Sequence, residues 1–181
     1  MNKKGKIFVI TGPSAVGKDS IVNSFIKKNG GKVIVSATSR SPRKNEKEGV
    51  NYYFLTKEEF EEKIKDNELL EYTIYNNNYY GTPKYAIDEY INKGINVFLV
   101  IEVEGALNVK RLMPESTLIF IMPPSLEELK HRIEKRGIDS KEDITRRLDI
   151  ANFEISQRDK FDYIFVNDEI DNVVNELEKI V

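Results

Sequence analysis

The sequence of 181 residues contains no cysteine and no tryptophan, and it has a single histidine, His131. The absence of cysteine excludes disulfide bonds and thiolate metal sites. Apolar runs are short as well, since near the N-terminus only IFVI, residues 7–10, precedes Thr11 and Gly12. Such a run is too short for a signal peptide or a membrane span, and we expect a cytoplasmic protein without membrane contacts.

An excess of charge of one sign is also missing, because 28 Lys and Arg stand against 30 Asp and Glu. The formal net charge of -2 gives no global attraction to nucleic acid, and we expect none as a partner. Any anion must therefore be bound by local groups of Arg and Lys. What the chain does have is a globular composition, 40% apolar and 32% charged, and a length that suits a single domain over residues 1–181.

Short β-branched runs alternate with amphipathic helices along much of the chain. This alternation predicts an α/β fold whose core is a five-stranded parallel sheet flanked by helices. Two helices begin at capping boxes, one formed by Thr56 with Glu59 and one by Ser125 with Glu128. The predicted buried strands are residues 7–10, 33–35, 97–103, 118–122 and 163–166.

Two stretches interrupt the alternation. Residues 36–82 contain one helix but many Tyr, Asn and Gly, and they predict a small, mostly antiparallel insert. Residues 125–155 are helical and rich in Arg, and they predict a helical flap. The predicted core is residues 1–35, 83–124 and 156–181. We expect the two appended parts to close over a site.

The segment GPSAVGKDS, residues 12–20, follows the first strand and predicts a phosphate-binding loop of the P-loop NTPase type. Such a Gly-rich turn directs backbone N–H groups toward one point at the positive end of a helix, and Lys18 adds a charge for the β- and γ-phosphates. Asp19 stands where a Ser or Thr usually ligates magnesium, and Ser20 offers a hydroxyl one residue later. The predicted nucleotide-binding residues are Gly12, Pro13, Ser14, Ala15, Val16, Gly17, Lys18, Asp19 and Ser20.

Residues 36–82 carry the signals of a second anion site. Arg40 and Arg43 offer two planar guanidinium groups, whose geometry suits phosphate. Tyr52 and Tyr80 add phenolic donors without adding charge. Each of these residues alone is typical of a loop or a core, but together they predict an anion site distinct from the phosphate-binding loop.

Motifs along nearly the whole chain, including SATSRSPR, GVNYYF, NYYGTP, IEVEGALNVK and FDYIFVND, resemble those of guanylate kinases. That family transfers the γ-phosphoryl group of ATP to GMP. The resemblance implies an ATP site at the phosphate-binding loop and a GMP site in the insert. It implies that the GMP phosphate is bound by Arg40, Arg43, Tyr52 and Tyr80, and that guanine faces Ser36, Glu71, Thr82 and Glu102.

Glu71 also favours guanine on chemical grounds. Guanine presents N1–H and its exocyclic amine as adjacent donors, and a carboxylate, which only accepts, can bridge both. Adenine presents an unprotonated N1 at the corresponding edge, so a buried carboxylate there would face another acceptor. A mismatch of this kind rejects the wrong base more strongly than an apolar pocket does.

The helical flap resembles the lid of the same family. Arg132 and Arg136 are four residues apart and share one helix face, a pattern that taken alone is more typical of a solvated surface. The resemblance implies that Lys18 and the lid arginines Arg132, Arg136 and Arg147 are catalytic, since phosphoryl transfer depends on positioning and charge neutralisation. It also implies that Asn167 contacts the adenine edge of ATP. His131 is expected on the helix surface, without a role.

The expected metal cofactor is Mg²⁺. Val100 stands where the family usually has the first of two acids, whereas Glu102 keeps the second. We therefore expect the nucleotide phosphates and waters to hold most of the magnesium shell, as this ion prefers. Ser20 and Glu102 are the candidate protein partners, directly or through water.

Two other functions remain open at this point. The GKDS turn also resembles ribose 1,5-bisphosphate phosphokinase, and a guanylate-kinase-like module that binds protein without catalysis would share the fold. A guanine-facing Glu71 beside NYYGT disfavours the first alternative. The retained Gly12, Gly17 and Lys18 disfavour the second. The sequence predicts neither an oligomeric state nor whether dGMP is used.

Overall fold

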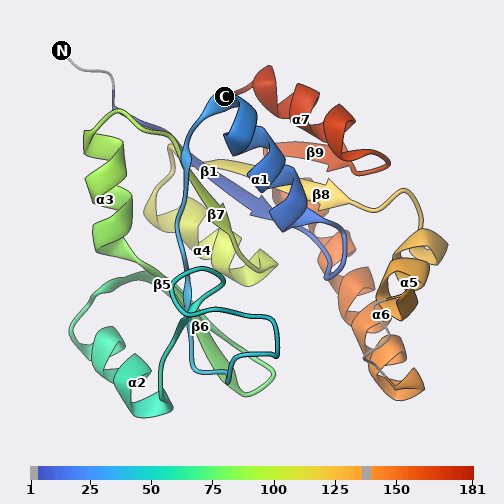
Figure 1. The fold of residues 1–181 in the computed structure, drawn as a ribbon, viewed down its shortest axis with the longest axis horizontal. Coiled ribbons are helices and arrows are strands. Elements are labelled where there is room, and N and C mark those ends of the chain that lie inside the picture. The colour runs from blue at the N-terminus through green and yellow to red at the C-terminus, as the bar shows by residue number, and fades with distance from the viewer. Residues whose placement is uncertain (1–3, 136–139) are drawn as a thin grey trace. The chain divides into compact units, whose positions relative to one another are not determined.

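The first strand of the chain, β1 (Ile7–Thr11), is the central strand of a five-stranded parallel sheet in the computed structural model (Figure 1). The structure describes residues 4–135 and 140–181. The strand order is β2–β7–β1–β8–β9, where the other strands are β2 (Lys32–Val33), β7 (Val97–Val100), β8 (Thr117–Met122) and β9 (Tyr163–Val166). Every residue of β1 is buried, as expected for a strand of a parallel sheet covered on both faces. The predicted α/β fold is confirmed.

The chain divides into two compact units, and the boundary between them falls within β1. The first unit consists of Met1–Phe8 and Gly31–Ser116, and the second of Val9–Gly30 and Thr117–Val181. The predicted insert, residues 36–82, belongs to the first unit, and the predicted lid, residues 125–155, to the second. The division into core, insert and lid itself stays a prediction.

The first unit contains a second sheet with the strand order β4–β3–β6–β5. These strands are β3 (Ala37–Thr38), β4 (Tyr53–Phe54), β5 (Leu69–Tyr75) and β6 (Asn78–Pro83). β5 and β6 form an antiparallel hairpin whose turn residues, Asn76 and Asn77, have φ angles of 48° and 62°. Asn tolerates this left-handed region, and two such residues match the twist of a hairpin. β3 pairs antiparallel with β6 and parallel with β4, so the sheet is mostly antiparallel, as predicted.

The helices of the first unit are α2 (Lys57–Lys65), α3 (Lys84–Asn92) and α4 (Val103–Leu112). The predicted capping box of α2 is confirmed: the Glu59 amide donates to the Thr56 hydroxyl at 3.1 Å, and the Thr56 amide donates to the Glu59 carboxylate at 2.6 Å. Phe60 is fully buried against Ala37 and Leu69, and it anchors α2 on the second sheet.

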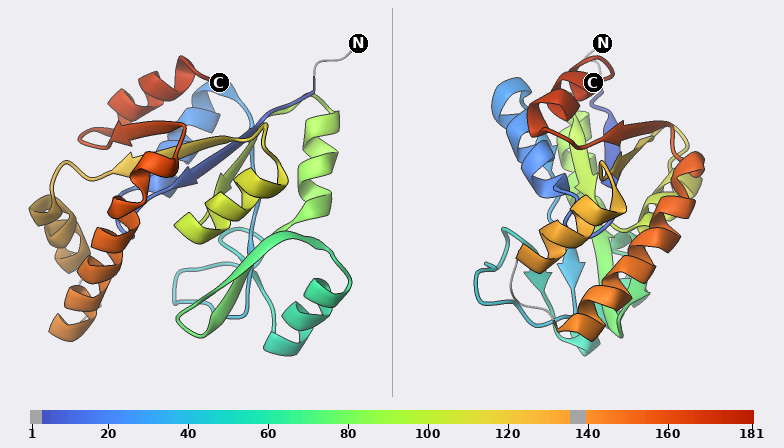
Figure 2. Two further views of the ribbon diagram at one scale, coloured as in Figure 1. Left: turned by 180° about the vertical axis from the view of Figure 1, so that it is seen from behind. Right: turned by 90° about the vertical axis from the view of Figure 1, so that its right-hand side faces the viewer.

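The helices of the second unit are α1 (Lys18–Asn29), α5 (Leu126–Lys135), α6 (Lys141–Ser156) and α7 (Ile170–Glu178), with a 3₁₀ turn at Arg158–Lys160. α1 lies beside α7, and α5 beside α6 (Figures 1 and 2). Leu129, Ile133 and Ala151 form the buried cluster between α5 and α6, and Ala15 packs against it. Among the residues that the structure describes, no helix has the length and apolar character needed to cross a membrane.

Several predicted strands differ from the observed ones. The strand predicted at 97–103 ends at Val100, and Glu102 is instead the N-cap of α4. The strand predicted at 33–35 is Lys32–Val33. β9 occurs where predicted, but Tyr163, Ile164 and Val166 are 40%, 41% and 52% exposed, so the prediction that this strand is buried was wrong. The reason is its place at the edge of the sheet, where it has a single neighbouring strand.

Candidate active site

The loop between β1 and α1 has a backbone conformation that depends on two glycines. Gly12 has a φ of 143°, and a Cβ atom at this position would lie 2.3 Å from the Ile121 carbonyl oxygen. Gly17, the N-cap of α1, has a φ of 98°. Ala15 also has a positive φ, 66°, a strained conformation that is often found at functional sites. The loop leads into a 12-residue helix whose first N–H groups have no partner within the helix, and this arrangement favours phosphate.

Lys18 is the first residue of α1, and its side chain bends back over the loop. The Lys18 Nζ donates hydrogen bonds to the Gly12 carbonyl at 2.5 Å and to the Pro13 carbonyl at 3.0 Å. The ammonium group is therefore held where the loop turns. Asp19 and Ser20 are exposed in the same helical turn. The helix dipole favours a carboxylate at this end, which agrees with the interpretation of Asp19 as a helix-start residue.

Asn167 links the loop between β1 and α1 to Arg132, one of the predicted lid arginines. Its side-chain Nδ2 donates to the Val16 carbonyl at 2.7 Å. Its backbone carbonyl accepts a hydrogen bond from Nη2 of Arg132 at 3.2 Å. Arg132 is also paired with Glu128, whose Oε1 lies 2.9 Å from Nε. Asn167 is 4% exposed, and its Oδ1 is buried without a hydrogen-bond partner. The side chain thus contacts the loop, and its predicted contact with adenine stays a prediction.

Arg147, a second predicted lid arginine, approaches the loop from α6. Its Nη1 lies 3.5 Å from the Ser14 hydroxyl. Arg147 therefore approaches the loop that carries Lys18, and Arg132 is connected to that loop through Asn167. Arg136, the third predicted lid arginine, lies outside the described residues. His131 is exposed on α5, as expected for a residue without a role.

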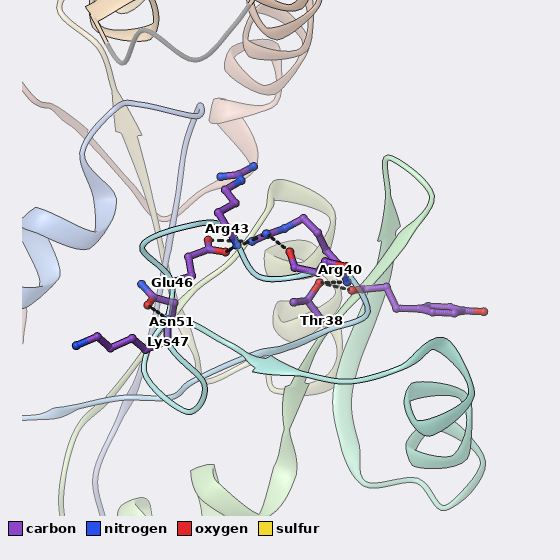
Figure 3. A network of polar contacts seen from close by, with 8 residues as sticks. Thr38, Arg40, Arg43, Glu46, Lys47 and Asn51 are labelled. Carbon is purple, nitrogen blue, oxygen red and sulfur yellow. Dashed lines mark hydrogen bonds and ion pairs between the residues drawn. The ribbon is translucent and has the colours of Figure 1, made fainter.

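In the first unit, Arg40 lies in a network of polar contacts in the loop after β3 (Figure 3). Its Nη1 and Nη2 donate to the two carboxylate oxygens of Glu46, each at 2.9 Å. Glu46 also accepts from the backbone amide of Arg43 at 2.8 Å, whereas the Arg43 side chain extends away from this carboxylate (Figure 3). The hydrogen bond to Glu46 raises the pKa of Arg40 further above its usual value, so the guanidinium stays charged.

Two tyrosines accompany Arg40. The guanidinium carbon lies 5.6 Å from the centroid of the Tyr52 ring, and the rings of Tyr52 and Tyr80 meet edge to face with centroids 5.9 Å apart. The Tyr80 hydroxyl lies close enough to Arg40 to contribute to the raised pKa of the guanidinium. Three of the four residues predicted to bind the acceptor phosphate are therefore in one cluster, and Arg43 lies in the same loop.

Glu71 of β5 is the centre of the predicted guanine site. It is 7% exposed, and its Oε1 accepts a hydrogen bond from the Thr82 hydroxyl at 2.7 Å. The hairpin register explains this contact, because Glu71 pairs with Thr82. A small cavity of about 20 Å³ adjoins Glu71, and its walls include Ser36, Tyr52, Glu71, Tyr80 and Glu102. Five of the eight residues predicted for the GMP site thus line this cavity, and the other three, Arg40, Arg43 and Thr82, do not.

Burial raises the pKa of Glu71 to about 7. The hydrogen bond from Thr82 works against this rise, and the negative charge of Glu104 adds to it. Near neutral pH the group is therefore balanced between a charged acceptor and a neutral acid. Two donors from a ligand would favour the charged form.

Gly105 of α4 leaves room for the Glu71 carboxylate. A Cβ atom at this position would lie 2.9 Å from Glu71 Oε2, too close for any side chain without displacement of the carboxylate. Neither Gly105 nor Glu46 was predicted from the sequence as a site residue. The available signal for Gly105 was an isolated glycine inside a helical pattern. The available signal for Glu46 was an acid within the basic segment SRSPRKNEK. Neither signal identifies the partner, which for Gly105 comes from another part of the chain and for Glu46 depends on how its own loop folds.

The candidate magnesium partners are a hydroxyl and a carboxylate. Ser20 is exposed in the first turn of α1, and Glu102 is a half-buried N-cap whose side chain makes no cap hydrogen bond. In the described part of the chain, no group of three or more His, Asp or Glu side chains is placed to hold a metal ion. Binding of Mg²⁺, which keeps several waters and binds mainly through substrate phosphates, stays a prediction.

Residues 4–181 of the chain match the model of the guanylate kinase family. The guanylate kinase of Oceanobacillus iheyensis is 45% identical over 182 aligned positions, which cover 100% of this chain and 88% of the relative. The guanylate kinase of Prochlorococcus marinus is 44% identical and is covered to 99% of its length by the whole of this chain.

Solved structures agree with the sequence relatives. The crystal structure of guanylate kinase from Anaplasma phagocytophilum matches with a TM-score of 0.82 and 32% identity, over 99% of this chain and 85% of that chain. Shikimate kinase from Bacteroides thetaiotaomicron matches with a TM-score of 0.51 and 11% identity, which is a likeness of fold alone.

Proposed function

Because the chain belongs to the guanylate kinase family, we propose that the two groups of residues described above are its ATP and GMP sites. The enzyme transfers the γ-phosphoryl group of ATP to GMP and releases ADP and GDP. The observation that carries the assignment of residues is Glu71, a buried carboxylate in a cavity whose walls also include Tyr52 and Tyr80. A carboxylate in this position suits a base with two adjacent donors.

In the proposed GMP site, Glu71 accepts from guanine N1–H and the exocyclic amine, with Ser36, Thr82 and Glu102 around the base. Arg40, Arg43, Tyr52 and Tyr80 hold the phosphate. The cavity of about 20 Å³ has room for roughly one water molecule, so its walls must open to admit a purine. Supporting this division, Arg40 clusters with Tyr52 and Tyr80, and both tyrosines line the cavity.

In the proposed ATP site, backbone amides of residues 12–20 surround the phosphates and Lys18 leaves the Gly12 and Pro13 carbonyls to meet the β- and γ-phosphates. Arg132, Arg136 and Arg147 neutralise the charge of the transferred group, and Asn167 contacts the adenine edge. The acceptor is itself a phosphate oxyanion, so the step needs no strong general base. Positioning and electrostatic stabilisation are the contributions of the protein.

The proposal includes Mg²⁺. The ion neutralises phosphate charge when it is bound with ATP. Ser20 and Glu102 would contact it, directly or through its waters, while nucleotide phosphates supply the other ligands. We further propose that the reaction takes place in the cytoplasm, as part of purine nucleotide metabolism.

Neither alternative function has support from the comparisons. The relatives named above are guanylate kinases that align along the whole of this chain. A kinase that acts on ribose bisphosphate binds no base, so it would not need the Glu71 site. A module that only binds protein binds no nucleotide phosphate, so it would not need the glycines at 12 and 17.

An acceptor screen tests the proposed function. ADP formation is followed in a coupled assay with ATP and Mg²⁺ and with GMP, dGMP, AMP or ribose 1,5-bisphosphate as acceptor. We expect turnover with GMP and a preference over AMP of about 10⁴-fold, because a site built to pair with donors rejects a base that lacks them. ADP formation with ribose 1,5-bisphosphate and none with GMP would overturn the proposal.

A further inference from the structure

Glu46 is a half-buried acid among the basic residues of the proposed phosphate site, and the function described above gives it no role. Its side chain and that of Arg40 are each 16% exposed. The two groups meet as a fork, with Nη1 bonded to Oε2 and Nη2 to Oε1, each at 2.9 Å (Figure 3). Parallel bonds of this kind fix the plane of a guanidinium as well as its distance.

The same carboxylate shapes the loop that carries the second arginine. Glu46 Oε2 accepts from the Arg43 amide at 2.8 Å, and the Glu46 amide donates to the Arg43 carbonyl at 3.0 Å. One side chain thus orients the Arg40 guanidinium and closes the turn from Arg43 to Glu46. Partial burial opposes ionisation of Glu46, but the donors of Arg40 and Arg43 outweigh it and hold its pKa below the usual range.

The remaining donors of Arg40 show what this arrangement leaves for a ligand. A guanidinium has five N–H groups. Glu46 accepts one from each terminal nitrogen, and the Ser41 carbonyl accepts from Nη1 at 2.7 Å. The Nε–H and one N–H of Nη2 remain, and these two lie on the same edge of the planar group. Nε is buried without a hydrogen-bond partner, and the Tyr80 hydroxyl lies beside the guanidinium.

We propose that Glu46 is a positioning residue for the acceptor phosphate: it holds the terminal edge of Arg40 so that the Nε edge meets the phosphate of the nucleoside monophosphate. This inference rests on the proposed GMP site. In the opposite case, Glu46 would act as a stand-in anion that GMP has to displace. The two cases differ in sign, because removal of a positioning group weakens GMP binding and removal of a competitor strengthens it.

The test compares Glu46→Ala and Glu46→Gln with a matched control, Glu62→Gln. Glu62 is an exposed acid of α2 in the same unit and undergoes the same change of charge. KM for GMP, KM for ATP and kcat are measured for each variant. For Glu46→Ala we expect KM for GMP to rise roughly 10- to 100-fold, the range for loss of hydrogen bonds to a charged group, with KM for ATP within about 2-fold of wild type. Glu46→Gln keeps one acceptor and should show a smaller rise.

A second readout separates positioning from a general loss of structure. Binding of GMP and of guanosine, which lacks the phosphate, is measured by calorimetry. GMP binding should weaken in both variants while guanosine binding stays at the wild-type value. Tighter GMP binding, unchanged GMP binding, or an equal loss for both ligands would overturn the inference. Wild-type enzyme without GMP-dependent turnover would instead refute the proposed function itself.

Discussion

At the scale of single residues, Glu71 is the group whose chemistry depends most on its surroundings. A solvated glutamate is ionised at any physiological pH, but burial raises the pKa of Glu71 to about 7. The folded protein therefore binds a proton more tightly than the unfolded chain, and the stability that this proton supplies is lost as pH rises from 4.5 to about 7. GMP binding has the opposite dependence, since the carboxylate must be ionised to accept from guanine.

This opposition predicts a pH-dependent KM for GMP. Between pH 6 and pH 8 the ionised fraction of Glu71 rises about tenfold, so KM for GMP should fall by a similar factor in wild type. Glu71→Gln cannot ionise, and its KM should be higher at all pH values. The ratio of variant KM to wild-type KM removes the titration of GMP itself, and this ratio should grow with pH. A ratio that stays constant from pH 6 to pH 8 would contradict the role given to Glu71.

Lys18 permits a second prediction at this scale. Its ammonium group contacts loop carbonyls at 2.5 and 3.0 Å, close to where the phosphates are proposed to bind. Lys18→Ala should lower kcat by about 10³-fold or more, because the charge acts on the transferred phosphoryl group. GMP affinity, measured by calorimetry, should remain near the wild-type value. Lys27→Ala, which removes an exposed charge at the other end of α1, is the control and should leave kcat unchanged.

At the scale of elements, helix starts were predictable and strand exposure was not. A capping box is local, because Thr56 and Glu59 bond to each other's amides within one turn. The exposure of β9 depends on strand order, which places it at the edge of the sheet. The apolar segment YIFV is typical of a buried strand, and its exposure can be predicted only when the strand order is known.

The cap of α2 can be tested by a stability measurement. Thr56→Ala removes the acceptor for the Glu59 amide and should lower the free energy of unfolding by about 1 kcal/mol, with a fall in Tm of about 2–4 °C. Chemical and thermal denaturation would measure both quantities. Glu62→Ala, in the middle of the same helix, should change Tm by less than half as much. Equal losses in the two variants would mean that the capping bonds contribute little.

At the scale of the whole molecule, each substrate should stabilise the protein on its own. A ligand at 100 times its Kd adds about 2.7 kcal/mol to the free energy of unfolding, which corresponds to a rise in Tm of about 5–10 °C for a chain of this size. GMP alone and ATP with Mg²⁺ alone should each produce such a shift in a thermal denaturation experiment. In Lys18→Ala the shift with GMP should persist and the shift with ATP should shrink. Loss of both shifts would contradict two separately formed sites.

The sequence by itself determined the fold class, the phosphate-binding loop and the family, because these depend on patterns within short segments: a strand before GPSAVGK, helix caps three residues apart, and motifs spaced along the whole chain. Only the tertiary structure decided that Glu46 pairs with Arg40, that Gly105 makes room for Glu71, and that β9 is exposed. The second and third properties come from neighbours distant in the chain, whereas Glu46 and Arg40 lie six residues apart and meet because of the conformation of their loop. The desolvation of a carboxylate and the partner of a guanidinium have no signature in the residue pattern, since the first arises when separate segments pack together and the second depends on the conformation of a loop.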